Sequence, residues 1–414
     1  MNKELKDIVD YAYNNSPFYK SLYSKYFDKS MTDKIEFSML PLVEKKDLSD
    51  SSLRLIPEKW YGDFVEHKLA KYATSGSTGI CLDIYWSQEN LNRSLLGLWY
   101  LRKKYYNISP GDKCCTFYSN RREGYDEPKQ IQEGNYLSFS KSNLDAERLY
   151  EIYNMMSAFM PHYLIVEPSI ALLLSEYMKK NKLDKIESIK YIELTGEFLN
   201  DSVRKEIEEC FECITANQYG AYEVNSIAFE CPEGNMHCMK HNVYVEILDE
   251  TGNKSEESIE GDIYVTSLTN YVMPFIRYKI GDRGRLYTSH CCKCGNSAPI
   301  LKLTNGRCND FIICEDGSRI HSSVFVKAVE NTNKVMGKPI IQYQIHQITY
   351  DHFVVKLVLA YDDVDMQTLA KTFGRLLDEE RLYHSNITFE RYEELFPDDN
   401  TGKLYYFINE MHMF

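Results

Sequence analysis

The middle of the chain alternates short apolar runs with longer stretches in which apolar residues recur at helical spacing. An apolar run at 163–166 is followed by a turn and by an apolar helix from Ile170, for which Ser169 is the expected N-cap. The order repeats as a strand at 189–194, a helix at 200–210 and a strand at 214–218. Strands that alternate with helices are typical of βαβ units and a mostly parallel sheet, whose ligands bind beyond the carboxyl ends of the strands.

From about residue 242 the pattern becomes that of short strands. Residues 243–248 and 262–266 are strand-like segments that flank a Thr251-Gly252 turn. A domain boundary is predicted at Gly306-Arg307, because the residues beyond it carry their own strand–helix–strand pattern. We therefore predict an α/β protein. Its large N-terminal domain (1–305) would have βαβ-built sheets and a β-rich subdomain, and a small C-terminal α/β domain (306–414) would follow.

Composition limits the classes of partner. The chain has 48 basic and 61 acidic residues, a net charge of −13, which argues against general nucleic-acid binding. No apolar run approaches the roughly 18 residues that span a bilayer, and the N-terminal residues lack the apolar core of a signal peptide. We expect a cytoplasmic protein with no nucleic-acid or membrane partner. Its twelve cysteines are then thiols or metal ligands rather than disulfides.

A turn rich in glycine and hydroxyl side chains follows the basic, aromatic segment 71–73. Its glycines let the backbone bend sharply toward an anion, and its hydroxyls add donors for phosphate oxygens. The segment lacks the Lys-Ser/Thr pair of the P-loop, and by itself it is equally compatible with a plain surface turn. Its six residues are Thr74, Ser75, Gly76, Ser77, Thr78 and Gly79.

Six segments occur in a fixed order along the chain: 74–79, 196–197, 219–223, 278–282, 306–307 and 402–403. Together they resemble the adenylate-forming superfamily of acyl-CoA synthetases, firefly luciferases and peptide-synthetase adenylation domains. Residues 16–20, 40–45 and 274–282 are particularly similar to the branch of phenylacetate–CoA ligases and coenzyme F390 synthetases. The resemblance covers nearly the whole chain, and the ordered set is far more specific than any single motif.

The resemblance implies an activity. A carboxylic acid, by analogy an aryl or arylacetic acid, would react with ATP to give an acyl-adenylate and pyrophosphate, and the acyl group would then pass to CoA. A carrier-protein phosphopantetheine thiol or an amine is the alternative acceptor. A non-catalytic nucleotide-binding scaffold is a further alternative. The sequence leaves the oligomeric state open, a dimer included.

The resemblance also implies roles for individual residues at the nucleotide. The turn at 74–79 would hold the β- and γ-phosphates, and Glu223 would hold Mg²⁺, a cation that prefers oxygen ligands. Asp282 would accept both ribose hydroxyls, and Tyr219 would pack on the adenine face. In the alternative, Glu223 is a charge at a helix N-terminus and Tyr219 a core residue. Gly196, Glu197 and Gly220 complete the predicted nucleotide contacts.

In the C-terminal domain, Arg307 would reach the ribose or a phosphate, and Asn309 stands at the pivot about which a mobile lid would turn. Lys403 matches the family's catalytic lysine, whose ammonium bridges the substrate carboxylate and the phosphates. The alternative for Lys403 is a solvated lysine after a turn. Two departures stand out: residues 80–82 replace the usual Pro-Lys, and Tyr222 replaces a threonine that normally faces the α-phosphate.

A second constellation combines cysteines with a histidine. The segment 231–237 and the Cys-x-Cys-Gly segment 292–295 have the residue types of a closed, four-coordinate zinc site, which would be structural because no position is left for a reactive water. Cys291 could replace Cys292, Cys238 is a spare thiol, and unligated cytoplasmic cysteines are the alternative. The predicted ligands are Cys231, His237, Cys292 and Cys294.

Overall fold

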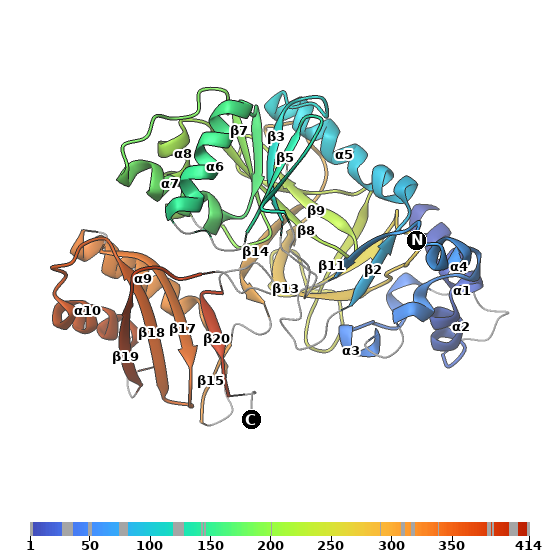
Figure 1. Cartoon of the computed structure of the whole chain (residues 1–414). Coiled ribbons are helices and arrows are strands. Elements are labelled where there is room, and N and C mark those ends of the chain that lie inside the picture. The colour runs from blue at the N-terminus through green and yellow to red at the C-terminus, as the bar shows by residue number, and fades with distance from the viewer. Residues whose placement is uncertain are drawn as a thin grey trace. The chain divides into compact units, whose positions relative to one another are not determined.

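The computed structural model describes residues 3–26, 36–48, 52–73, 82–118, 128–141, 144, 146–199, 201–289, 291–307, 311–315, 319–337, 339–378, 382, 385–396 and 405–411 (Figure 1). The chain divides into two compact units. One comprises Met1–Phe117, Gln130–Phe139 and Leu149–Thr304, and the other comprises Tyr118–Lys129, Ser140–Arg148 and Asn305–Phe414. None of the helices in the described ranges has the length and apolarity needed to span a bilayer.

A large sheet organises the first unit. Twelve described strands follow the order β11-β12-β13-β14-β10-β9-β8-β7-β6-β3-β5-β4. Their bounds are β3 (Cys114–Tyr118), β4 (Gln130–Glu133), β5 (Tyr136–Ser140), β6 (Tyr163–Val166), β7 (Tyr191–Thr195), β8 (Ile214–Ala221), β9 (Asn225–Glu230), β10 (Met236–Cys238), β11 (Val243–Leu248), β12 (Gly261–Ser267), β13 (Tyr278–Tyr287) and β14 (Ile300–Arg307).

The predicted βαβ units form the parallel part of this sheet. Strands β3, β6, β7 and β8 are mutually parallel, and helices α7 (Pro168–Lys180) and α8 (Asp201–Phe211) connect β6 to β7 and β7 to β8. The predicted start of α7 is wrong. The helix begins at Pro168 with Glu167 as N-cap, because proline suits the first helical position, where its missing N–H would have no partner anyway.

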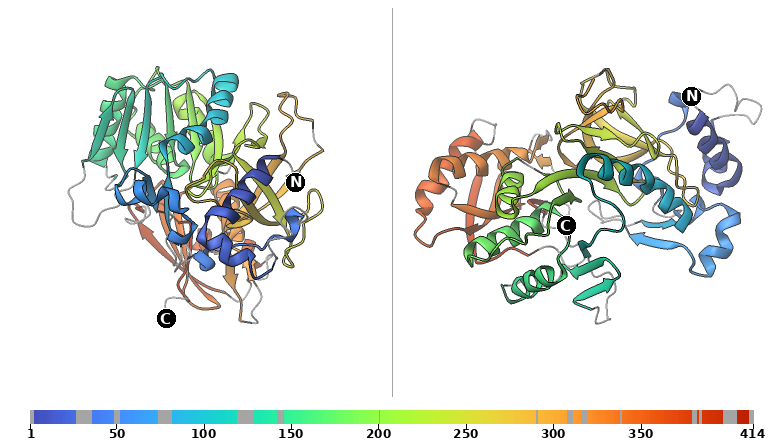
Figure 2. Two further views of the ribbon diagram at one scale, coloured as in Figure 1. Left: turned by 90° about the vertical axis from the view of Figure 1, so that its right-hand side faces the viewer. Right: turned by 90° about the horizontal axis from the view of Figure 1, so that it is seen from above.

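Helices cover both faces of the parallel strands (Figure 2). Arg102 of α5 (Gln88–Tyr106) donates to the Glu193 carboxylate at 2.7 Å, and Arg204 of α8 donates to the Thr215 hydroxyl at 2.9 Å. In the sheet register Glu193 lies beside Ala216, one residue beyond Thr215. Successive side chains of a strand point to opposite faces, so α5 and α8 lie on opposite faces of the sheet.

The β-rich part is antiparallel. Strands β11, β12 and β13 pair in sequence, and β8 forms a hairpin with β9. A separate antiparallel pair, β1 (Ala70–Ala73) and β2 (Asp83–Trp86), flanks residues 74–81. Val265, Phe275 and Trp86 belong to one buried core with these strands. The other described helices of this unit are α1 (Lys3–Asn15), α2 (Pro17–Tyr23), α3 (Lys45–Leu48) and α4 (Tyr61–Val65). Short 3₁₀ turns lie at Phe37–Met39, Ser52–Leu55 and Glu58–Trp60. Helix α6 (Ala146–Phe159) begins in a segment of the second unit and continues into the first.

The second unit is built around its own small sheet, ordered β19-β18-β17-β20. Phenylalanines from helix and strands, among them Phe325 and Phe353 at 5.1 Å, fill its core. Helix α10 of this unit ends at Asp378. The elements are β15 (Phe311–Ile313), β16 (Arg319–His321), α9 (Ser323–Met336), β17 (Ile340–Gln347), β18 (His352–Leu359), α10 (Met366–Asp378), β19 (Asn386–Tyr392) and β20 (Phe407–Asn409).

Candidate functional site

The hairpin of β8 and β9 carries the centre of the predicted nucleotide site. Tyr219 and Gly220 lie near the end of β8, and Glu223 lies in the turn that leads to β9. A Cβ atom at Gly220 would lie only 2.7 Å from the Asn225 carbonyl oxygen, so this position of the hairpin requires glycine. Because Glu223 lies in a hairpin turn, the alternative that it is a charge at a helix N-terminus is wrong.

A buried phenol contacts the Glu223 carboxylate. The Tyr278 hydroxyl donates to Glu223 Oε1 at 3.1 Å, and the two side chains are 1% and 6% exposed. Burial, and then the charge of Glu223, raise the pKa of Tyr278 well above its usual value. The phenol therefore keeps its proton and remains the donor of this hydrogen bond.

A second phenol contacts the other predicted carboxylate. The Tyr219 hydroxyl donates to Asp282 Oδ2 at 2.7 Å. Asp282 follows Gly281, whose φ of 94° belongs to the left-handed region that favours glycine. The glycine of the Ile-Gly-Asp turn thus sets the backbone from which Asp282 meets the hairpin. The structure brings Tyr219 and Asp282 together, as the predicted nucleotide site requires.

Both strands next to residues 74–81 contact the turn that holds Glu223. The Trp86 indole N–H of β2 donates to the Tyr222 carbonyl at 2.9 Å. The Tyr72 ring of β1 stacks on the Tyr222 ring, with centroids 5.5 Å apart and planes at 15°. Tyr222, which stands where the family usually has a threonine, fits here because its ring stacks on Tyr72 and its side chain is 45% exposed.

The predicted contacts at the end of β7 lie close to α7. The Glu197 carboxylate accepts hydrogen bonds from the Ser169 backbone N–H at 3.0 Å and from the Ser169 hydroxyl at 2.8 Å. It therefore satisfies a donor in the first turn of α7, where helix N–H groups lack partners within the helix. This contact gives Glu197 a structural role, and its role at a nucleotide stays a prediction, as does that of Gly196.

Several predicted residues fall outside what the structure describes. These are the turn residues Thr74, Ser75, Gly76, Ser77, Thr78 and Gly79, the predicted pivot Asn309, and the predicted catalytic Lys403. Arg307 ends β14, and only its backbone is described. Their roles remain those that the family resemblance implies.

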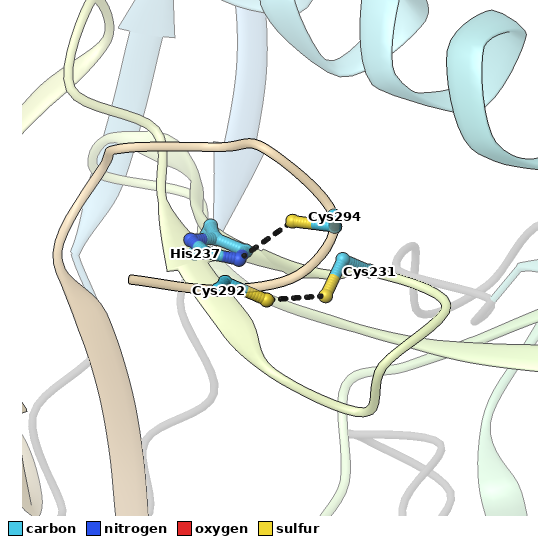
Figure 3. Close-up of side chains that lie close together, drawn as sticks. All are labelled: Cys231, His237, Cys292 and Cys294. Carbon is cyan, nitrogen blue, oxygen red and sulfur yellow. Dashed lines mark hydrogen bonds between the residues drawn. The ribbon is translucent and has the colours of Figure 1, made fainter. Parts of the chain in front are cut away.

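The four predicted metal ligands come together (Figure 3). One ligand atom from each of Cys231, His237, Cys292 and Cys294 lies within 4.8 Å of the others. The sulfurs of Cys231 and Cys292 are 3.7 Å apart, and Cys294 Sγ is 3.2 Å from His237 Nε2. Tetrahedral zinc with Zn–S bonds of about 2.3 Å places neighbouring sulfurs about 3.8 Å apart. The donor set and its spacing therefore fit zinc, and the cluster includes Cys292 rather than the exposed Cys291.

Surrounding groups orient the ligands. The ring nitrogen His237 Nδ1 lies 3.1 Å from the Ala298 carbonyl oxygen, so it carries the proton and leaves Nε2 to face the sulfurs. The Asn235 amide donates to Cys292 Sγ at 3.4 Å, and the Tyr105 hydroxyl donates to Cys294 Sγ at 3.5 Å. Such second contacts to metal ligands fix their orientation.

The thiols of the cluster differ in acidity. Burial raises the pKa of Cys231 to about 12. For Cys294, burial acts in the same direction, but hydrogen bonds led by the Tyr105 phenol outweigh it and lower the pKa. Three crowded thiols with a histidine are a natural place for a cation, because metal ligation stabilises all three thiolates at once.

Sequence reasoning missed the side chains that support both sites. Tyr278, Tyr72 and Asn235 occur in segments named above, but without the roles they have here, and Trp86 and Tyr105 were given no role. The sequence held one signal, the Tyr-Lys-Ile-Gly-Asp order of residues 278–282, but the left-handed φ of Gly281 interrupts the regular alternation of the strand there. The partner of each side chain depends on strand pairing, which spacing alone does not reveal.

Comparisons with known proteins support the fold. No family model matches the chain. The chain is 25% identical over 423 residues to protein CapK of Staphylococcus aureus, covering 99% of this chain and 88% of that protein. It is 29% identical over 165 residues to a phenylacetate-coenzyme A ligase of Thermus thermophilus, covering 38% of this chain and 37% of that protein.

Solved structures match over almost the whole chain. A 2-hydroxyisobutyryl-CoA ligase in the postadenylation state, in complex with 2-HIB-AMP, superimposes with a TM-score of 0.77 at 17% identity, covering 99% of this chain and 89% of that one. The chain has the fold of the adenylate-forming ligases. The predicted α/β class and the family resemblance are confirmed. The amide bond synthetase McbA from Marinactinospora thermotolerans also matches, with a TM-score of 0.53 at 14% identity over 81% of this chain and 68% of that one.

Proposed function

We propose that the protein is an AMP-forming acid ligase. A carboxylate oxygen attacks the α-phosphorus of ATP, pyrophosphate leaves, and the acyl-adenylate then passes its acyl group to the thiol of CoA with release of AMP. The observation that carries the proposal is the meeting of Tyr219, Glu223, Tyr278 and Asp282 through two phenol–carboxylate hydrogen bonds in a chain with the fold of adenylate-forming ligases.

Each residue has a part in this reaction. Asp282 binds the ribose hydroxyls, and Tyr219 lies on the adenine. Glu223, a buried carboxylate with hard oxygen donors, suits Mg²⁺, which when bound offsets the negative charge of the phosphates. Residues 74–79, Arg307 and Lys403 supply further phosphate-directed donors and cations where two anions meet. Residues 306–414, which belong to the second unit, act as the mobile lid.

The acceptor has three candidates. CoA is the first, because relatives and solved structures similar to this chain carry the names of CoA ligases. An amine is the second, favoured by the similarity to an amide bond synthetase, and a carrier-protein thiol would use the same first step. A scaffold that binds nucleotide without catalysis is the remaining alternative.

The Cys/His cluster is proposed as a structural zinc site. Its four donors, Cys231, His237, Cys292 and Cys294, fill a tetrahedral shell, which leaves no position for substrate or a reactive water. No disulfide joins the described cysteines. We place the protein in the cytoplasm, where thiols stay reduced and can serve as metal ligands.

The test is a panel of carboxylic acids assayed for pyrophosphate release with ATP and Mg²⁺, with CoA present and absent. We expect one structural class of acid, aryl or arylacetic, to support release, and CoA to convert the reaction from a single turnover to steady turnover. If amines but not CoA have this effect, the amide-forming alternative is correct. If no acid supports release, the scaffold alternative is favoured.

A further inference from the structure

Two segments of the large unit exchange phenol–carboxylate hydrogen bonds. The β8–β9 hairpin supplies the Tyr219 hydroxyl to Asp282, while β13 supplies the Tyr278 hydroxyl to Glu223. Each segment thus gives one donor and receives one. The two carboxylates are those proposed above for the ribose and for the divalent cation.

The donor on β13 is held rigidly. Tyr278 pairs with Val265 of β12 on one side and forms a bridge with Val43 on the other. The Val43 N–H donates to the Arg277 carbonyl at 3.0 Å, and the Lys279 N–H donates to the Val43 carbonyl at 2.8 Å. The ring of Tyr278 packs on Phe275 with centroids 5.0 Å apart. Its hydroxyl therefore has a fixed position.

The acceptor on the hairpin depends on its neighbours. Glu223 lies in a short turn closed by a Val224 N–H to Ala221 carbonyl hydrogen bond of 3.1 Å. Turns are mobile unless other groups hold them, and here Trp86 and Tyr278 contact the backbone and the side chain of the turn. A carboxylate offers about four lone-pair sites, of which the phenol bond occupies one.

We propose that Tyr278 and Tyr219 are positioning residues that preorganise the two carboxylates of the nucleotide site, Tyr278 for the divalent cation and Tyr219 for the ribose. The proposal rests on the proposed function for the identity of the ligand. Each phenol fixes a carboxylate that belongs to the other segment, so the hairpin and β13 adopt their binding geometry together before ligand arrives. Preorganised groups bind without the cost of ordering them at the moment of binding.

The chain contains a matched control. Tyr191 of β7 is also a buried tyrosine, 1% exposed, and its hydroxyl also donates to a buried carboxylate, Glu193 Oε2, at 3.1 Å. That carboxylate pairs with the Arg102 guanidinium, so it is part of the fold. Tyr191→Phe removes the same atom from the same kind of bond in the same unit, away from the proposed nucleotide residues.

The experiment measures ATP affinity by calorimetry without an acid substrate, once with chelator and once with saturating Mg²⁺. The unmutated protein should bind ATP more tightly with Mg²⁺. Tyr278→Phe should reduce that gain about tenfold and leave the affinity in chelator unchanged, since changes next to metal ligands typically cost tenfold or more in metal affinity. Tyr219→Phe keeps the aromatic ring and should weaken ATP binding several-fold in both conditions. Tyr191→Phe should change neither.

The outcomes separate this proposal from the proposed function. An unchanged Mg²⁺ gain in a folded Tyr278→Phe variant would overturn the positioning role of Tyr278, even if the unmutated enzyme releases pyrophosphate. If both phenol variants lose ATP affinity as described, but no acid supports pyrophosphate release by the unmutated protein, the positioning role is supported and the proposed ligase activity is rejected. If Tyr278→Phe does not fold, Tyr219→Phe decides the question. An unchanged ATP affinity of this variant, in chelator and in Mg²⁺, would reject the proposal. An equal loss of ATP affinity in Tyr191→Phe would reject it as well.

Discussion

The Cys/His cluster and the proposed nucleotide site hold their key residues in opposite ways. In the cluster the ligands approach one another directly, with Cys231 Sγ 3.7 Å from Cys292 Sγ. In the nucleotide site the carboxylates Glu223 and Asp282 are each held by a phenol from another segment. Four ligands that approach one another directly suit a structural ion, whereas a carboxylate oriented by a phenol suits the binding of a further ligand. Changes in the Cys/His cluster should therefore reduce stability, and changes at the two carboxylates should reduce nucleotide binding and enzymatic activity.

The largest expected effect follows from removal of the metal. Structural zinc contributes roughly 10 kcal/mol or more in small zinc-binding peptides, and even about 5 kcal/mol would lower the melting temperature by about 10 °C in a domain of this size. We expect about one zinc per chain by elemental analysis of protein purified without added metal, and a loss of this order in chelator.

Cysteine variants provide the control for that prediction. Cys292→Ala should reproduce the loss of stability, whereas Cys238→Ala, which also removes a buried thiol, should cost far less because Cys238 is not among the clustered ligands. Protein that carries less than about 0.2 equivalents of zinc, and whose stability is the same in chelator, would rule out the metal site, since structural zinc binds tightly.

The next effect concerns Lys403, the lysine of the proposed lid. Lys403→Ala should reduce acid-dependent pyrophosphate formation by about 10²–10³, because a transition-state charge contact contributes roughly 3–4 kcal/mol. The same variant, given chemically made acyl-adenylate and acceptor, should complete the second step at nearly the normal rate. Equal losses in both steps would contradict a lid that brings Lys403 to the site for adenylation only.

A smaller effect is expected at Asp282, the proposed ribose ligand. Asp282→Ala should weaken ATP binding by roughly tenfold to a hundredfold, because hydrogen bonds to a charged group contribute about 1.5–3 kcal/mol. Calorimetry measures this directly, and Asp282→Asn, which keeps one acceptor oxygen, should lose less. If Asp282→Ala binds ATP normally, Asp282 serves only the turn and its bond to Tyr219.

The smallest effect is expected at the aromatic stack. Tyr222→Thr restores the family's usual residue but removes the ring that packs on Tyr72, a contact of about 0.5–1.5 kcal/mol. We expect a fall in melting temperature of a few degrees at most, with Tyr222→Phe unchanged. A marked gain in pyrophosphate release by Tyr222→Thr would show that the tyrosine limits catalysis rather than supports the turn.

The same contrast explains what could be predicted from the sequence. Cysteine and histidine carry their chemistry in their side chains, so the segments at 231–237 and 292–295 indicated the cluster before its geometry was known. The βαβ order around β6, β7 and β8 could be predicted because hydrophobic periodicity distinguishes helices from strands. The start of α7 was misplaced because Pro168 overrides the hydrophobic pattern.

Contacts between distant strands could not be predicted from the sequence. The bond from Tyr278 to Glu223 joins residues 55 apart, and it depends on the pairing of β13 with β12 and on the tight hairpin at Gly220. Likewise, the contact of Glu197 with Ser169 follows from where β7 ends relative to α7. Local spacing does not fix either arrangement, because strand pairing and helix packing are set by the whole core.

Acid-dependent pyrophosphate release by the unmutated protein tests the central claim most directly. With ATP, Mg²⁺ and a broad panel of carboxylic acids, and with no acceptor present, the account predicts a burst of about one pyrophosphate per active site for a single class of acid, because the acyl-adenylate stays bound. A protein that binds ATP yet releases no pyrophosphate with any acid would contradict it.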